Sequence, residues 1–177
     1  MSLEFLDKRF HIVAGKGGVG KSTLCAVMGL LAAKAGKRTV IAEFNTRGSQ
    51  PRLFGKASNG YEVTPLCENL FSINIQPRPA MREYGLRKLK LARVYDVVFE
   101  NDAMKRMLRM IPGMTELILL GKAFDLERER APGGQPAWDL VIIDAPATGH
   151  GVSLLKLPQT ILNVVSVGPM ADEVRDM

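Results

Sequence analysis

Short apolar runs and longer helical patterns alternate along this chain. The short runs, rich in β-branched residues, are typical of strands, and they occupy 10–14, 39–43, 70–76, 138–144 and 162–167. Residues 21–35 are rich in Leu, Ala and Met and precede Gly36, which predicts a helix with a glycine stop. We therefore predict an α/β protein with a mostly parallel sheet flanked by helices, in which the runs at 10–14 and 138–144 are buried strands.

Two longer stretches separate these strands. Residues 45–65 are rich in Gly, Ser, Asn and Pro, so a long loop is expected there. Between 79 and about 126 a helical insert is expected, interrupted at Pro112–Gly113. Within the insert, apolar residues recur on one helix face: Met104, Met107, Leu108 and Ile111. We interpret 1–177 as one domain that contains this insert.

The segment AGKGGVGKST (14–23) follows the first predicted strand and opens the first predicted helix. Within it, residues 15–22 match G-x-x-x-x-G-K-[S/T], the phosphate-loop pattern. Its glycines let backbone N–H groups wrap around phosphate oxygens, and the helix adds its positive N-terminal end. The residues expected to bind the nucleotide are Gly15, Gly17, Gly18, Val19, Gly20, Lys21, Ser22 and Thr23.

Individual side chains are candidates for the chemistry of a nucleotide bound with Mg²⁺. Lys21 is expected to reach the β- and γ-phosphates, and the Ser22 hydroxyl to bind the ion. Asp144 ends a strongly apolar strand, where a phosphate-loop NTPase needs a carboxylate to hold a water on Mg²⁺. Taken alone, such an aspartate is equally typical of a turn or a helix cap.

Net charge and cysteine content indicate the cellular location of the protein more than its activity. A net charge of +6 without a long run of like charge suits phosphate ligands, nucleic acid or an anionic membrane equally. Cys25 and Cys67 lack metal-ligand spacing, and Cys25 is expected to be a buried, inert thiol. Two unpaired cysteines, and an N-terminus without an apolar signal segment, predict a cytoplasmic location.

Lys16 is a second lysine in the loop, at a position where the phosphate-loop pattern requires none. KGGVGKS (16–22) resembles the deviant Walker A motif of the MinD/ParA, nitrogenase-iron-protein and ArsA group. The resemblance implies a P-loop NTPase fold and an ATP-dependent homodimer in which Lys16 reaches the partner's nucleotide. A cation delivered across an interface would neutralise charge that develops in the transition state. From the residues alone, the alternative is that Lys16 is a solvated loop lysine.

DAPATGH (144–150), continued by LLKLP (154–158), resembles the second switch of the ArsA family. That family includes arsenite-pump ATPases and the ATPase that delivers tail-anchored membrane proteins. The resemblance implies ATP/ADP and Mg²⁺ as ligands, and a dimeric open/closed switch that handles a partner, cargo or membrane component. The choice of ATP over GTP rests on it alone. Because family members continue into further strands, the chain is expected to be incomplete after Met177.

The first switch departs from the family pattern. The family has an aspartate just after the second strand, thought to position the attacking water, and Asn45 occupies that place. An amide can orient water but cannot take its proton, so hydrolysis is expected to be slow or to use Glu43 or another group. A nucleotide-binding switch with little catalysis and a MinD/ParA-like positioning ATPase remain alternative functions. The absence of metalloid cysteines argues against arsenite handling.

The helical insert lies where the targeting relatives build a hydrophobic client groove. Its methionines suit an adaptable binding surface, although a methionine stripe at helical spacing is more often part of a core. Its basic side chains between 82 and 93 suit a solvated face first, and an anionic membrane or acidic partner second. The expected partners are a second copy of the chain and an unidentified protein cargo or membrane component, without nucleic acid.

Overall fold

The computed structural model describes residues 4–44, 46, 48–58, 60–89 and 113–146, apart from the side chains of 87–89. The described residues form two compact units. The first is drawn from Met1–Ile75 and Ala123–Val152 and contains the phosphate loop and a sheet. The second includes Gln76–Lys122, and therefore α3 (Pro77–Leu89) and the first turns of α6 (Met114–Arg128).

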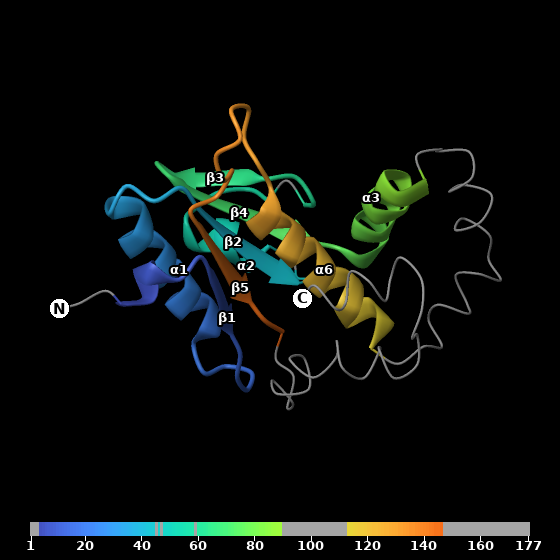
Figure 1. Cartoon of the computed structure of the whole chain (residues 1–177). Helices are drawn as coiled ribbons and strands as arrows, with labels where there is room; N and C mark the ends of the chain where they lie inside the picture. The colour runs from blue at the N-terminus through green and yellow to red at the C-terminus, as the bar shows by residue number, and fades with distance from the viewer. Residues whose placement is uncertain (1–3, 45, 47, 59, 90–112, 147–177) are drawn as a thin grey trace. The chain divides into compact units, whose positions relative to one another are not determined.

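A sheet forms the centre of the first unit (Figure 1). In the described part of the chain it has five strands in the order β1-β5-β2-β4-β3. Their bounds are β1 Phe10–Val13, β2 Thr39–Phe44, β3 Thr64–Cys67, β4 Leu70–Ile75 and β5 Leu140–Asp144. Four of them run parallel, and β3 joins β4 antiparallel at one edge. The prediction of a mostly parallel α/β sheet is confirmed.

The position of β5 decides which residues meet at the end of the sheet. It pairs with β1 on one side and β2 on the other, although it begins 130 residues after β1 begins. In this register Asp144 lies beside Val13 in β1 and beside Glu43 in β2. Val13 immediately precedes the phosphate loop. The carboxylates of Asp144 and Glu43 therefore lie at the carboxyl ends of their strands, where that loop begins.

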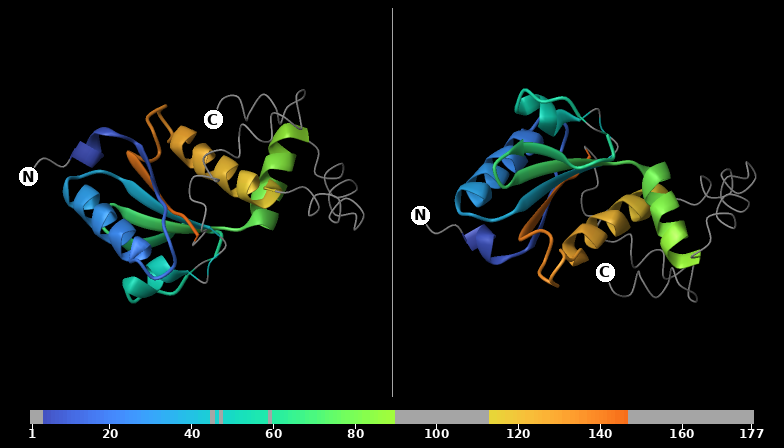
Figure 2. Two further views of the ribbon diagram at one scale, coloured as in Figure 1. Left: turned by 90° about the horizontal axis from the view of Figure 1, so that it is seen from below. Right: turned by 90° about the horizontal axis from the view of Figure 1, so that it is seen from above.

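The helix α1 (Lys21–Lys34) covers one face of this sheet (Figures 1 and 2). Cys25 and Ala32 belong to a buried cluster that also contains Ile41 from β2 and Ile142 from β5. The helix ends at Lys34, two residues before Gly36, whose φ of 80° is the left-handed conformation that glycine adopts without strain. The predicted first helix and its glycine stop are confirmed.

The segment 45–65 is more structured than predicted. It contains the short helix α2 (Ser49–Leu53), and β3 begins at Thr64. Pro51 lies in the first turn of α2, where a missing N–H costs nothing, so the turn-forming composition is compatible with a helix. Pro65 is accommodated in β3 because β3 is an edge strand of the described sheet. The prediction of a long loop was therefore wrong at both places.

Burial differs between the first and the last of these strands. All five residues of β5 are buried, as predicted for a strand covered on both faces. All four residues of β1 are only half-buried, so the prediction of a buried first strand was wrong. The difference follows from position, since β5 has a neighbour on each side while β1 lies at the edge of the described sheet.

The described part of the insert is helical on both sides of the predicted break. α3 begins at Pro77, and α6 begins at Met114, directly after Gly113. The methionine stripe at 104–111, much of the basic segment and the strand predicted at 162–167 lie outside the described residues. In the part that the structure describes, no helix is both long and apolar enough to cross a membrane.

Gly29 makes the closest contact between α1 and the sheet, and it gives a test of this packing. A Cβ built there would lie 2.8 Å from Leu70 Cδ1 and 3.0 Å from Ile41 Cδ1. We expect Gly29→Val to lower the free energy of unfolding by about 1–3 kcal/mol, because the added methyl groups overpack the interface. Leu24→Val introduces the same residue at a position that is 51% exposed. It should lower the free energy of unfolding by only a few tenths of a kcal/mol. Urea unfolding of both variants measures the difference, and equal midpoints would contradict this packing.

Candidate functional site

The phosphate loop connects Val13 of β1 to Lys21 of α1. Gly18 and Gly20 have φ of 77° and 89°, the left-handed region in which a side chain would be strained. Gly20 is also the N-cap of α1, and because glycine has no side chain it cannot cap the first amide groups of the helix. The first amide groups of α1 are therefore not satisfied by a capping side chain and can bind an anion.

The two lysines of the loop have different positions. Lys21 is half-buried, and its Nζ donates a hydrogen bond to the backbone oxygen of Lys16 at 2.9 Å. This contact holds the Lys21 side chain against the backbone of the phosphate loop. Lys16 itself has an exposed side chain, as does Val19, which is 64% exposed. The fold thus leaves the Lys21 side chain half-buried against the loop backbone and the Lys16 side chain exposed, in agreement with the different roles that the sequence suggests for them.

Asp144 is 5% exposed and lies close to the first turn of α1. Its Oδ2 accepts a hydrogen bond from Gln50 Nε2 at 3.1 Å, and the same nitrogen donates to the Ser22 backbone oxygen at 2.9 Å. One amide thus links Asp144 and Ser22, the two residues predicted to organise Mg²⁺. The structure brings them together as the sequence analysis expected, through a residue that it did not identify.

Glu43 forms a second buried carboxylate beside Asp144. Its side chain has no exposed surface, and its Oε1 accepts three hydrogen bonds from two residues in the segment after β2. The donors are Thr46 Oγ1 at 3.0 Å, the Ser49 backbone N–H at 2.8 Å and Ser49 Oγ at 2.5 Å. Its Oε2 has no partner among the described residues. The carboxylate therefore holds the start of α2 close to the end of the sheet.

Asn74 of β4 anchors the same segment from the other side. Its Oδ1 accepts the Thr46 backbone N–H at 3.0 Å, and its Nδ2 donates to the Thr46 backbone oxygen at 2.7 Å. Asn74 lies next to Glu43 in the β2–β4 register, so the two side chains bind the segment between β2 and α2 from neighbouring strands. Asn45, the residue predicted to replace the catalytic aspartate, lies outside the described residues, as do 147–177 with His150.

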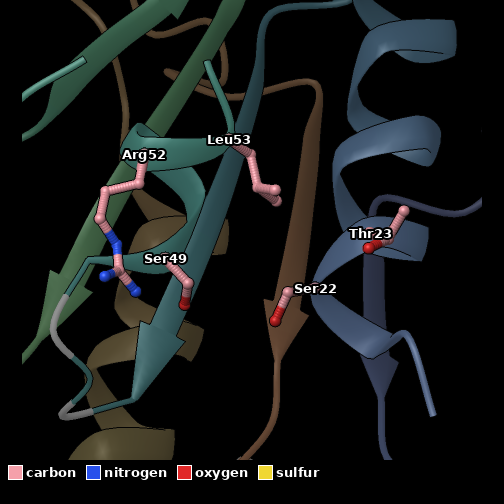
Figure 3. Close-up of a pocket in the computed structure, with 5 residues that line it drawn as sticks. All are labelled: Ser22, Thr23, Ser49, Arg52 and Leu53. Carbon is pink, nitrogen blue, oxygen red and sulfur yellow. The ribbon is translucent and has the colours of Figure 1, made fainter. Parts of the chain in front are cut away.

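A pocket of about 360 Å³ lies beside this site (Figure 3). Ser22 and Thr23 line it from α1, while Ser49, Arg52 and Leu53 line it from α2. The lining therefore combines three hydroxyl groups with one arginine and the apolar side chain of Leu53, and the Ser49 hydroxyl is already bound to Glu43.

The oxygen atoms at this site are of the kind that Mg²⁺ binds at a nucleotide. In the part of the chain that the structure describes, no three His, Cys, Asp or Glu side chains gather in a metal-binding group. Mg²⁺ at a nucleotide needs only one or two protein oxygens, because phosphates and waters complete its octahedron. Ser22 and Asp144 carry hard oxygen donors of this kind, and the buried Oε1 of Gln50, which has no partner among the described residues, lies beside them.

Comparison with known proteins agrees with this geometry. The family model described as "Anion-transporting ATPase" matches residues 8–177. The chain belongs to the anion-transporting ATPase family. The resemblance to the ArsA family found in the motifs is thus confirmed.

Two curated relatives show how far this family likeness extends. ATPase BagA of Mycobacterium tuberculosis is 26% identical over 175 residues, which cover 92% of this chain and 49% of that protein. ATPase ASNA1 homolog 1 of Paramecium tetraurelia is 29% identical over 163 residues, which cover 88% of this chain and 45% of that protein. The chain therefore spans about half the length of the curated relatives it matches.

For this anion-transporting ATPase family member, sequence reasoning missed the residues that hold the site together. Gln50, Ser49 and Asn74 lie in segments that carry no recognised motif. A weak signal was available, because Glu43 and Asn74 interrupt largely apolar strands and both positions are buried. Polar residues at such positions need buried partners, and small polar side chains nearby in the sequence are the first candidates.

Cys25 lies beneath this site and has no exposed surface, as predicted for an inert thiol. Burial and the neighbouring carboxylates, Asp144 before Glu43, raise the pKa of Cys25 to about 12. A raised pKa keeps the thiol protonated at neutral pH, and the thiolate that reacts forms only as the pH approaches 12. Cys67 is exposed, so the two thiols of this family member are expected to differ strongly in reactivity.

We expect a thiol reagent at neutral pH to modify Cys67 quickly and to leave Cys25 unmodified until the protein unfolds. Cys67→Ser should therefore abolish the fast phase, while denaturant should restore reaction at Cys25. Absorbance during reaction with a chromogenic disulfide measures both rates. A fast phase that persists in Cys67→Ser would contradict the buried placement of Cys25.

Proposed function

We propose that this protein binds ATP with Mg²⁺ and hydrolyses it, and that the nucleotide drives a switch between an open and a closed homodimer. The observation that supports this most directly is the convergence of Lys21, Ser22 and Asp144 at one end of the sheet, beside glycines in the conformation that an anion-binding loop requires. Membership of an ATPase family supports the same nucleotide.

Each group has a defined role in this proposal. The loop amides and Lys21 hold the β- and γ-phosphates, and the hydrogen bond from Lys21 to the Lys16 oxygen keeps the ammonium at the loop before nucleotide arrives. Ser22 and Asp144 would hold Mg²⁺, Asp144 through a water molecule. When bound, Mg²⁺ would neutralise negative charge on the β- and γ-phosphates.

The exposed side chain of Lys16 supports its role in a partner subunit. A lysine fixed within its own loop would be unavailable for that purpose, whereas a surface lysine can reach across an interface. Such a cation stabilises the negative charge that spreads over the transferred phosphoryl group. The proposal includes a protein cargo or membrane partner that the switch handles.

Lys21→Ala tests nucleotide binding. We expect it to weaken ATP binding by about 100-fold or more, because charged hydrogen bonds to phosphate oxygens are lost. Lys34→Ala removes an exposed lysine from the last turn of the same helix and should leave binding unchanged. Titration with a fluorescent ATP analogue measures both affinities. Equal binding by Lys21→Ala and the unmodified protein would refute the assignment of the phosphate loop.

Lys16→Ala separates binding from turnover. We expect ATP affinity to be retained and the rate of phosphate release to fall by about 10³-fold, as for loss of an arginine finger. Single-turnover phosphate release from preloaded protein measures this step. Full activity in Lys16→Ala would exclude the trans-acting lysine, while binding without phosphate release in the unmodified protein would assign the chain to a non-hydrolysing switch.

A further inference from the structure

Gln50 is a buried amide in contact with two groups of the candidate metal site. It has no exposed surface, and it comes from α2, a segment that no motif covers. Its Nε2 donates to Ser22, 28 residues earlier in the sequence, and to Asp144, 94 residues later. The side chain therefore joins α1, α2 and β5, the three elements that meet where the ion would be held.

Burying this amide costs free energy, and packing alone gives no reason for an amide at this position. Taking a polar group out of water costs free energy unless all its hydrogen bonds to water are replaced by hydrogen bonds within the protein. The Nε2 of Gln50 is satisfied, but its Oε1 has no partner among the described residues and is shielded from solvent. An apolar side chain of similar volume would fill the same space without that cost. The unsatisfied acceptor therefore points to a ligand with a hydrogen to donate.

We propose that Gln50 is a positioning residue for the Mg²⁺ of the nucleotide, an inference that rests on the function proposed above. Its hydrogen bond to Oδ2 fixes the plane of the Asp144 carboxylate, so that the second carboxylate oxygen has a set direction. Its hydrogen bond to the Ser22 oxygen fixes the first turn of α1. Its Oε1 is the acceptor for a water molecule in the coordination shell of the ion.

The surroundings of Gln50 hold it in place independently of nucleotide. The preceding residue, Ser49, is bound to Glu43 through both its backbone N–H and its hydroxyl. Thr46 is bound to Glu43 and, through its backbone, to Asn74. These contacts order the start of α2 before the ion binds, so that Gln50 loses little conformational freedom in contacting it.

The test compares Mg²⁺ dependence in Gln50→Leu and Gln50→Met, both of which lack the amide but keep similar volume. Binding of a fluorescent ATP analogue is measured first in excess chelator and then during a Mg²⁺ titration. We expect the Mg²⁺ concentration for half-maximal binding or turnover to rise about 10- to 100-fold, while the affinity for metal-free nucleotide changes little. Gln135→Leu makes the same replacement at an exposed loop residue and serves as the control.

Each result separates this role from simpler ones. If Gln50 serves only the fold, both affinities fall together with the urea midpoint, and the positioning role is overturned. If the titrations of both variants match the control, it is overturned as well. If the unmodified protein binds no nucleotide under either condition, the proposed function fails and takes this role with it. A selective loss of Mg²⁺ dependence in either folded variant supports it.

Discussion

The insertion of β5 between β1 and β2 is the constraint on which the site depends. Hydrogen bonding in this order fixes Asp144 next to Val13 and Glu43, within one strand spacing on either side. The phosphate loop leaves the sheet at Val13, beside Asp144, and Gln50 joins the first turn of α1 to the Asp144 carboxylate. A different strand order would leave the same residues in the chain without a common site.

The end of the sheet is built from buried polar side chains, which is costly unless they satisfy one another. Glu43, Gln50, Asn74 and Asp144 are all at least 95% buried, and each is hydrogen-bonded to the loop, to α2 or to a backbone group. In a low-dielectric setting such a network is rigid when complete. Two acceptors, Glu43 Oε2 and Gln50 Oε1, have no partner among the described residues, so the network retains capacity for a further donor.

The ability to predict these features from the sequence differed from residue to residue. The phosphate loop was predictable because its glycines must adopt conformations that other residues avoid, as the φ of Gly18 confirms. Asp144 was predictable because it ends a run that is apolar on both faces. Helix α2 was missed because glycine and proline suit both loops and the first turn of a helix. Gln50 was missed because its partners are 28 and 94 residues away in the sequence.

By itself the sequence determined which side chains can contact phosphate and a cation, since that chemistry resides in residue type and local spacing. The loop, its two lysines and the strand-ending aspartate follow from this alone, as does the family. Tertiary structure decided which of them meet. It left the Lys21 side chain half-buried against the backbone of Lys16 and the Lys16 side chain exposed, and it placed an unremarked glutamine between Ser22 and Asp144. Such contacts depend on strand order and helix packing, which join residues far apart in the chain and leave no short-range pattern.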